Sequence, residues 1–362
     1  MAGAKILKIV DGIVGPCAVR ALSRLGVTAP CKDRVIRRIL VIRPGGMGDA
    51  ILLIPMLAVL GSNYPSAAID VLAERRNSAI FALSRDVRRI FHYASPFDLA
   101  RVIQGHYDVV IDSEQWHRLS AVVARLTGAR ITVGFASNER SRLFTHPIPY
   151  SLEEHERDSF LRLLAPLGCV LSHDAEPPYL TVPSEIYDSV RPRLASLRTR
   201  PIIALFAGGS IPDKRWAVRN FHGLASRLTE RGLAVVVVGG AGDTISGKEI
   251  VKGLEHAIDL TGTISLIQTA AVLAASILLV SNDSGILHLG AGVGARTVSL
   301  FGPGNTSKWA PRGPGHVALS KKLSCRPCSA FGYTPKCRNN NRCMDSITVD
   351  EVFETVMNAT ER

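Results

Sequence analysis

Long apolar runs are scarce in this 362-residue sequence. A helix that spans a membrane needs about 20 apolar residues, but the longest apolar run extends only from Ala50 to Gly61 and contains Pro55. A secretory signal is also missing, because Asp11 interrupts the apolar N-terminal stretch and no small-residue cleavage site follows it. We therefore expect a cytoplasmic protein.

Aromatic residues are also few, at 6% of the chain, and no recognition helix, zinc-finger spacing or RNP-like aromatic pattern is present. Positive charge, by contrast, is in excess, since 43 Lys and Arg residues face 31 Asp and Glu residues and give a net charge of +12. Acidic partners are expected for such a chain. An anionic membrane or a phosphorylated small molecule is favoured, and nucleic acid is the weakest of the three candidates.

Short β-rich segments alternate with segments of helical periodicity along most of the chain. The β-rich segments lie at 39–42, 68–72, 109–112, 131–134, 202–207, 234–238, 277–281 and 297–301. Alternation of this kind predicts doubly wound parallel sheets and an α/β fold.

The proline-rich stretch at 176–183 separates the segments into two series and marks a domain boundary. We predict an N-terminal extension at 1–36, one sheet domain at 37–180, a second at 181–345, and a C-terminal helix at 346–362. The apolar residues of the extension fall on one side of a helix, with Lys5, Lys8 and Asp11 elsewhere around it. Either this helix lies on an anionic membrane surface, or it packs on the first domain.

Ligands of parallel α/β sheets bind beyond the carboxyl ends of the strands, so the turns after the strands are the candidate sites. The first turn runs from Arg43 to Asp49 and lacks both a Walker lysine and a complete dinucleotide fingerprint. Gly46, Met47 and Gly48 are expected to present backbone N–H groups to a ligand at a helix N-terminus. Asp49 is then either a reactive carboxylate or a residue that complements the helix dipole.

The second and third turns repeat this pattern in the second series. Gly208 and Ser210 are followed by Lys214 and Trp216, a combination that suits a phosphate with a flat group beside it, although a solvated loop has the same composition. Gly239 and Asp243 follow a run of four valines. An acid at that position accepts from ribose hydroxyls or caps a helix.

The fourth turn is the most specific. Asp283, Ser284 and Gly285 open a predicted helix beyond a buried strand and aim N–H groups at an anion. His288 lies about one turn inside that helix, where a histidine is usually a core residue, but the adjoining Asp-Ser-Gly sequence favours a functional role.

The segment Ile39-Leu-Val-Ile-Arg-Pro-Gly-Gly-Met-Gly-Asp49, taken with Ser281-Asn-Asp-Ser-Gly-Ile-Leu-His288, closely resembles glycosyltransferase family 9, the ADP-heptose:lipopolysaccharide heptosyltransferases. Lys214-Arg-Trp216, Phe301-Gly-Pro303 and the cysteine-rich segment at 325–344 are also similar to that family. The resemblance implies a GT-B fold, in which two Rossmann-like domains face a cleft. The first domain would then take the acceptor and the second the nucleotide sugar.

The resemblance further implies inverting transfer of heptose from ADP-heptose to a lipid-linked acceptor of the lipopolysaccharide core. Asp49 matches the family's proposed base, Lys214 a residue that binds donor phosphate, and the residues at 283–288 its nucleotide-sugar loop. Two positions differ, since the family often has Thr where this chain has Ser284 and Glu where it has Asp243. The chain has no Asp-x-Asp sequence, so we expect catalysis without a metal, by a protein peripheral on the cytoplasmic face of the inner membrane.

Four of the seven cysteines are clustered near the C-terminus. Their spacing, C-x₂-C-x₈-C-x₅-C, suits four thiolates around a structural Zn²⁺ or Fe ion. Reduced thiols or an adventitious disulfide are the alternative, and a related branch of the family carries a four-cysteine iron site. The candidate ligands are Cys325, Cys328, Cys337 and Cys343.

Other functions remain open on the sequence alone. A transferase of the same fold with another nucleotide sugar or a protein acceptor, or a nucleotide-sugar epimerase, has similar glycine turns. A membrane-associated scaffold and an NAD-dependent dehydrogenase, in which Glu74 would bind ribose, are less favoured. Tyr107, Trp116, His117, Arg118, Arg140 and Arg142 are candidate contacts for a phosphorylated acceptor.

Overall fold

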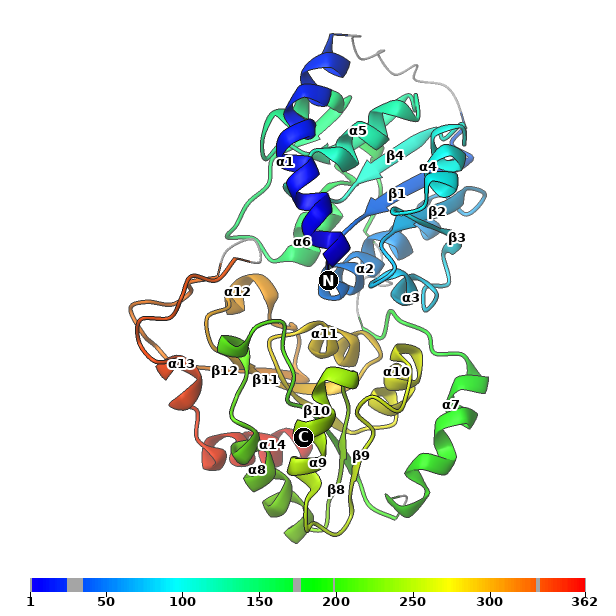
Figure 1. Cartoon of the computed structure of the whole chain (residues 1–362). Coiled ribbons are helices and arrows are strands. Elements are labelled where there is room, and N and C mark those ends of the chain that lie inside the picture. Colours follow the sequence, from blue (N-terminus) through cyan, green and yellow to red (C-terminus); the bar gives the residue numbers. More distant parts are fainter. Residues whose placement is uncertain (1, 25–34, 172–176, 198, 330–332, 362) are drawn as a thin grey trace. The chain divides into compact units, whose positions relative to one another are not determined.

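A computed structural model of the chain describes residues 2–24, 35–171, 177–197, 199–329 and 333–361, with side chains from residue 10 onward (Figure 1). The chain divides into an N-terminal unit, residues 1–176, and a C-terminal unit, residues 177–362. The predicted boundary at 180/181 therefore falls inside the C-terminal unit. Tyr179 and Leu180 belong there because both backbone N–H groups donate to the Gly292 carbonyl, at 3.0 Å each.

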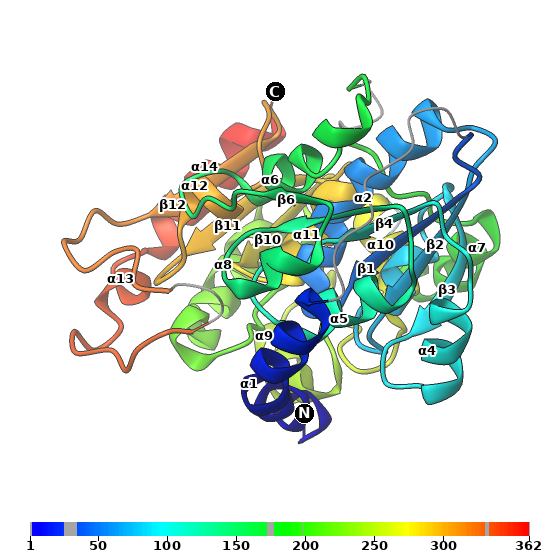
Figure 2. The same ribbon diagram turned by 90° about the horizontal axis from the view of Figure 1, so that it is seen from above.

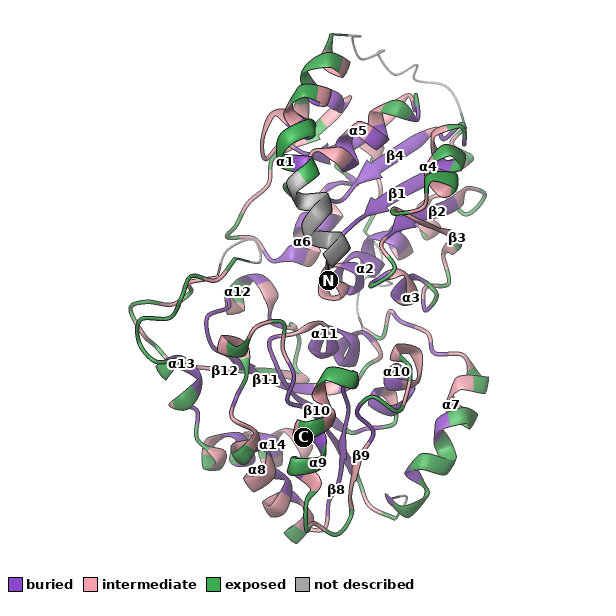
Figure 3. Ribbon diagram, in the orientation of Figure 1, coloured by how far each residue is buried: buried purple, intermediate pink, exposed green. Residues whose placement is uncertain are grey.

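The N-terminal unit is built on a six-stranded parallel sheet of order β3-β2-β1-β4-β5-β6. In register, Ile39 of β1 lies opposite Ile69 of β2 on one side and Val109 of β4 on the other. The inner strands are apolar and buried because helices cover both faces of the sheet (Figure 3). The strands are β1 (Arg38–Arg43), β2 (Ala68–Ala73), β3 (Val87–His92), β4 (Val109–Asp112), β5 (Ile131–Phe135) and β6 (His146–Ile148).

The C-terminal unit repeats this plan with the strand order β12-β11-β10-β7-β8-β9. Counted from its own first strand, each sheet has the order 3-2-1-4-5-6 of the Rossmann fold, so the predicted α/β class with two Rossmann-like sheets is confirmed. The order in which strands are added to the sheet reverses between β1 and β4 in the first sheet and between β7 and β10 in the second. The strands are β7 (Ile202–Phe206), β8 (Ala234–Val237), β9 (Ala257–Asp259), β10 (Leu278–Asn282), β11 (Arg296–Phe301) and β12 (His316–Ser320).

Helices follow most strands, as a doubly wound fold requires. The N-terminal unit has α1 (Ala2–Ser23), α2 (Met47–Asn63), α3 (Ser78–Phe81), α4 (Pro96–Ile103), α5 (Leu119–Leu126) and α6 (Glu156–Arg162). The C-terminal unit has α7 (Ser184–Val190), α8 (Val218–Glu230), α9 (Thr244–Val251), α10 (Leu266–Ala274), α11 (Gly285–Gly292), α12 (Thr306–Trp309), α13 (Arg342–Asp345) and α14 (Val349–Thr360). No helix in the described ranges is both long and apolar enough to cross a membrane.

Helix α1 packs beside α5 on the N-terminal unit (Figures 1 and 2). The buried Asp11 carboxylate accepts the N–H groups of Arg118 and Leu119, at 2.7 Å each, and so caps the start of α5. Val19 is part of the core. Among the described side chains of α1, Val10, Ile13 and Val14 are exposed, with Ile13 at 70%. The helix therefore has the packed arrangement of the two predicted ones, and contact of these exposed apolar side chains with a membrane remains a prediction.

The C-terminal helix α14 is an integral part of the second unit. Thr348 caps it by accepting the N–H of Glu351 at 3.2 Å. Val352, Phe353 and Val356 are buried in the same core cluster as the strands β7, β8 and β10.

Candidate functional site

The first glycine turn connects β1 to α2 and is fixed by the loop after β2. Gly45 has a φ of +113°, which favours glycine, and Gly46 is the N-cap of α2 in extended conformation. The Asn77 amide donates to the carbonyls of Arg43 and Gly45, at 3.1 and 3.3 Å, and Glu74 accepts the Gly45 N–H at 3.2 Å. Glu74 therefore holds the turn, which gives it a role other than the ribose contact considered above.

Asp49 lies in the first turn of α2, as predicted, and its side chain is 22% exposed. A Cβ atom on Gly46 would lie 3.1 Å from its Oδ2, so the turn approaches this carboxylate closely. Burial raises the Asp49 pKa from 3.8 to about 6, with Glu156 and Glu114 adding to the rise and Arg43 opposing it. A carboxyl group with this pKa is mainly ionised at neutral pH and suited to accepting a proton.

Arg43, the last residue of β1, connects Asp49 to a buried polar group. The guanidinium donates to the Ser113 carbonyl at 2.6 Å and to the Gln115 side chain at 3.1 and 3.2 Å. Its Nη2 lies 3.7 Å from Asp49 Oδ2 and 3.5 Å from Glu114 Oε2. Arg43, Glu114 and Gln115 were not among the predicted site residues, although their positions at the carboxyl end of β1 and in the turn after β4 were a signal for them.

Two of the candidate acceptor contacts are structural residues. The Tyr107 hydroxyl donates to Asp70 at 3.0 Å, and the fully buried Arg140 pairs with the equally buried Asp112. Trp116, in contrast, is 45% exposed on the turn after β4. An acceptor contact is therefore unsupported for Tyr107 and Arg140 and remains a prediction for Trp116.

In the C-terminal unit, the turns after β7, β10 and β11 meet at one ion pair. Lys214 Nζ lies 2.6 Å from Oδ2 of Asp283, which follows β10 and is almost completely buried. A Cβ atom on Gly304 would collide with the Asp283 carboxylate. Asn282, the last residue of β10, joins the turn after β10 to the turn after β7, because its amide donates to the carbonyls of Ala207 and Gly208 at 2.9 and 3.0 Å. The structure thus brings the predicted Lys214 and Asp283 together.

Ser284, Gly285 and His288 lie at the start of α11. Ser284 is the N-cap, and its hydroxyl accepts the Leu287 N–H at 3.4 Å, so the helix begins at Gly285 as predicted. His288 lies inside the helix and is 4% exposed. The helix N-terminus adjoins Asp283, and its partial positive charge favours an anion.

Asp243 belongs to the third glycine turn, and its carboxylate lies between that turn and the second one. Its Oδ2 accepts the Gly240 N–H at 2.9 Å. A Cβ atom on Gly208 would lie 2.7 Å from Oδ1, and one on Gly239 would lie 2.8 Å from Oδ2. Both glycines are therefore required for close approach of this carboxylate, whereas Ser210 is exposed at the surface.

Trp216 does not lie where the sequence analysis placed it. The indole is 1% exposed, packs edge-on against Phe221 with ring centroids 5.1 Å apart, and donates its N–H to the Ile347 carbonyl at 2.8 Å. Its backbone N–H donates to Asn282 at 3.1 Å. Trp216 is a core residue that fixes the turn, and a role of the indole beside a ligand is unsupported.

All four clustered cysteines line one small cavity of about 20 Å³, together with Asp213 and Arg342. Burial raises the pKa of the Cys328 and Cys343 thiols. Four sulfur donors on one cavity fit Zn²⁺ or Fe by their chemistry. Among the described residues, however, no group of three or more His, Cys, Asp or Glu side chains is arranged to hold a metal.

The cysteine loop is fastened to the turn after β11. The Arg326 guanidinium donates to the carbonyls of Gly302, Gly304 and Lys321, the last at 2.8 Å, and the Cys328 N–H donates to Pro303 at 3.0 Å. Because Gly304 adjoins Asp283, the loop supports the turn on which the Lys214–Asp283 pair depends.

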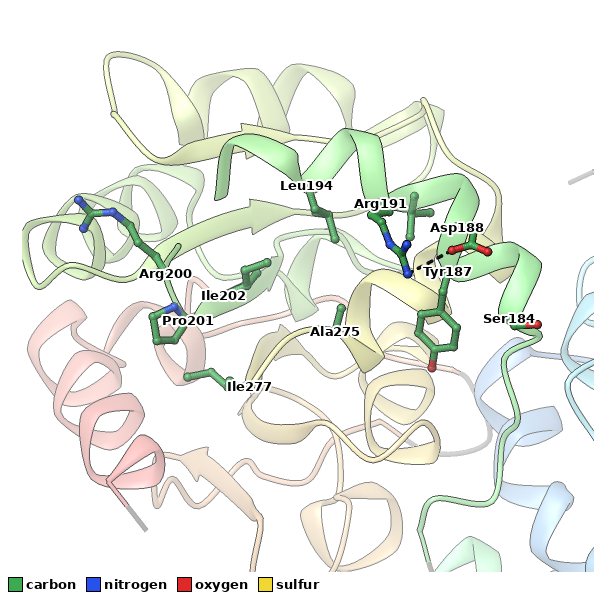
Figure 4. Close-up of a pocket in the computed structure, with 11 residues that line it drawn as sticks. Ser184, Tyr187, Asp188, Arg191, Leu194, Arg200, Pro201, Ile202, Ala275 and Ile277 are labelled. Atoms are coloured by element: carbon green, nitrogen blue, oxygen red, sulfur yellow. Dashed lines mark ion pairs between the residues drawn. The ribbon is translucent and has the colours of Figure 1, made fainter. Parts of the chain in front are cut away.

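A larger cavity of about 790 Å³ lies elsewhere in the C-terminal unit, between α7 and the sheet (Figure 4). Ile202 and Ile277 line it at the amino ends of β7 and β10, where an apolar wall meets the Asp188–Arg191 pair. None of the predicted site residues line it. Because ligands of such sheets bind at the carboxyl ends of the strands, it is not the predicted nucleotide site.

Comparison with known proteins identifies the family of this chain. Residues 97–337 match the family model described as glycosyltransferase family 9 (heptosyltransferase). The chain is 26% identical over 295 residues to lipooligosaccharide heptosyltransferase 2 of Haemophilus influenzae, covering 73% of this chain and 83% of the relative.

Two solved structures have the same fold. The ADP-heptose lps heptosyltransferase II of E. coli has a TM-score of 0.74 at 23% identity, covering 90% of this chain and 98% of that one. A glycosyl transferase of family 9 from Veillonella parvula has a TM-score of 0.76 at 22% identity, covering 90% and 97%.

Proposed function

The chain belongs to glycosyltransferase family 9, and from this premise we propose that it transfers heptose from ADP-heptose to a lipid-linked acceptor of the lipopolysaccharide core. The membership makes the protein a glycosyltransferase with two Rossmann-like sheets. The observation that carries the more specific proposal is the placement of Asp49, Lys214 and Asp283 at the carboxyl ends of strands, where such folds bind ligands.

The donor would bind to the turns of the C-terminal unit. Lys214 and the N-terminus of α11 at Ser284–Gly285 supply positive charge for the diphosphate. Asp243 would accept from the ribose hydroxyls of the nucleotide. The pairing of Lys214 with Asp283 keeps the ammonium group at this turn before a phosphate arrives, so little reorganisation is needed on binding.

The reaction is proposed to be a single displacement with inversion at the anomeric carbon. The Asp49 carboxylate takes the proton of the acceptor hydroxyl as its oxygen bonds to the anomeric carbon, and the bond from that carbon to the ADP oxygen breaks. The charge that develops on the leaving diphosphate is stabilised by Lys214 and the α11 N-terminus. The absence of an Asp-x-Asp sequence supports a reaction that needs no divalent ion on the donor.

We also propose that the protein works at an anionic membrane surface on the cytoplasmic side of the inner membrane, where a lipid-linked acceptor is available. The net charge of +12 and the exposed apolar face of α1 support this location. The four cysteine thiols are proposed to hold a structural Zn²⁺ or Fe ion, which would fix the loop that supports the donor turn.

Mass spectrometry of lipopolysaccharide from a strain that lacks this protein tests the proposal in the cell. The core should be truncated at a heptose, and the wild-type chain but not Asp49→Asn should restore it. A complete core in the deletion strain contradicts the proposed acceptor. Calorimetry with ADP-heptose, UDP-sugars and GDP-sugars then identifies the donor class, and preferential binding of UDP or GDP compounds would contradict the proposed donor.

A further inference from the structure

Arg43 is a charged residue that the proposed reaction does not use, although it lies beside Asp49. Its side chain is 2% exposed, and its guanidinium carbon lies 5.6 Å from the centre of the Phe160 ring. A buried charge is retained only where it is paired and hydrogen-bonded. What Arg43 pairs with is therefore informative about what it does.

The guanidinium is held in one orientation by uncharged acceptors. Nη1 donates to the Ser113 carbonyl and to Gln115 Oε1, and Nη2 donates to the same Gln115 oxygen. Because the guanidinium is planar, these three bonds fix the direction of Nη2, which faces Asp49 at 3.7 Å and Glu114 at 3.5 Å.

The acidic residues around this centre oppose ionisation of Asp49. Glu114 follows β4, and Glu156 opens α6, where its two carboxylate oxygens accept from Gln115 at 2.6 Å and from Tyr150 at 2.7 Å. The positive groups that act on Asp49 are Arg43 and, from the loop after β2, Arg76. Of these two arginines, only Arg43 is buried with the acids.

We infer that Arg43 is the positioning residue of the proposed base: it orients the Asp49 carboxylate and keeps it ionised against the negative charges of Glu114 and Glu156. The inference rests on the proposed function, in which Asp49 takes the acceptor proton. Glu156 has the opposite effect in the same network, and Gln115 connects the two by bonding to both. Reactivity of the base thus depends on a balance between one buried cation and two buried anions.

The pH dependence of kcat/KM separates these effects. The acid limb of the wild-type profile should lie near pH 6, the pKa to which Asp49 is raised. A positive charge within about 4–6 Å lowers a carboxyl pKa by about 1–3 units, so Arg43→Gln should move the acid limb upward by about one unit or more. Its kcat/KM at pH 6 should fall about fivefold or more, because the ionised fraction at that pH drops from about one half to about one tenth, and it should recover in part toward pH 8.

Glu156→Gln should move the same limb downward, because it removes a negative charge while keeping side-chain groups that can bond to Gln115 and Tyr150. Arg43→Lys keeps the positive charge but loses the planar set of N–H donors. The acid limb of its profile should therefore move less than in Arg43→Gln, while its maximal kcat/KM at higher pH should fall. Arg88→Gln is the matched control, since it removes an arginine paired with the buried Asp70 at 3.1 Å in the same sheet, and it should leave the limb in place.

Opposite shifts for Arg43→Gln and Glu156→Gln, with Arg88→Gln unchanged, support the inference. An unmoved limb in both variants overturns it, as does a shift of both in the same direction. Circular dichroism and denaturant unfolding with a probe in the N-terminal unit check that each variant is folded. If Arg43→Gln does not fold, Arg43→Lys is the test instead. An acid limb and a maximal kcat/KM in Arg43→Lys equal to those of the wild type would then overturn the inference. Asp49→Asn serves as the separate reference, because full activity in that variant refutes the proposed base rather than the role of Arg43.

Discussion

Replacing Asp49 with asparagine should stabilise the fold while it removes activity. The pKa of Asp49 is raised from 3.8 to about 6 in the folded chain, so the folded state binds this proton more tightly than the unfolded state does. Stability that is present below pH 3.8 is therefore lost as the pH rises toward 6 and above. Asparagine is uncharged like the protonated carboxyl group and does not ionise, so the variant does not lose this stability as the pH rises.

The size of the effect follows from the shift. At about 1.36 kcal/mol per pKa unit, the difference between 3.8 and about 6 corresponds to about 3 kcal/mol of unfolding free energy at pH 7.5. The same linkage gives a gain of only about 1 kcal/mol at pH 4.5. Turnover should meanwhile fall by about 10²–10⁴-fold, the usual contribution of a positioned general base.

Denaturant unfolding of the wild type and Asp49→Asn at both pH values measures this difference, with a probe in the N-terminal unit. Glu153→Gln provides a control in the same unit, because it makes the same change from a carboxyl group to an amide at an exposed side chain. A variant that is equally or less stable than wild type at pH 7.5 would refute a raised Asp49 pKa in the folded chain. If the gain in unfolding free energy were as large at pH 4.5 as at pH 7.5, it would have a cause other than the raised Asp49 pKa.

Four further outcomes follow from the same structure. Lys214→Ala should weaken ADP binding roughly 10–100-fold, the usual range for a lost hydrogen bond to a charged group, and unchanged affinity in calorimetry would exclude its phosphate role. Gly239→Ala should weaken donor binding because the new Cβ would lie 2.8 Å from Asp243 Oδ2, whereas Gly242→Ala, with no atom within 4 Å of its Cβ, should bind normally. Equal affinity of the two variants would argue against the Asp243 contact. Metal analysis of purified protein should find about one Zn or Fe per chain, lost in Cys328→Ser but kept in Cys169→Ser, and a content near zero in the wild type would reject the metal site. Ile13→Glu should reduce binding to vesicles rich in anionic lipid without unfolding the protein, since Ile13 is 70% exposed, and undiminished binding would show that α1 is not the membrane contact.

The sequence predicts the inner strands of both sheets but none of the four edge strands. The strands β3, β6, β9 and β12 lie at the sheet edges, where one side is unpaired, and every residue in them is half-buried or exposed, so the continuous apolar run of an inner strand is missing. Arg88 and Arg89 within β3 illustrate this, because both are exposed and hide the strand from a search for apolar segments.

The candidate site was predictable where chemistry lies in local turns, and not where it depends on contacts between distant segments. The positions of Asp49 and Ser284 at helix starts follow from their neighbours in the chain. The Arg43–Gln115 contact joins residues 72 positions apart, and no local pattern indicates it. Trp216 was misassigned for the same reason, since its indole bonds to Ile347, 131 residues away.

Transfer in a purified system tests the central claim most directly. The protein is incubated with ADP-heptose and a heptose-deficient lipopolysaccharide core, and both the released ADP and the mass of the acceptor are measured. The account predicts that the acceptor gains one heptosyl residue for each ADP released, and that neither product forms with Asp49→Asn. Release of ADP without gain of mass by the acceptor, or transfer by Asp49→Asn at the wild-type rate, would contradict it.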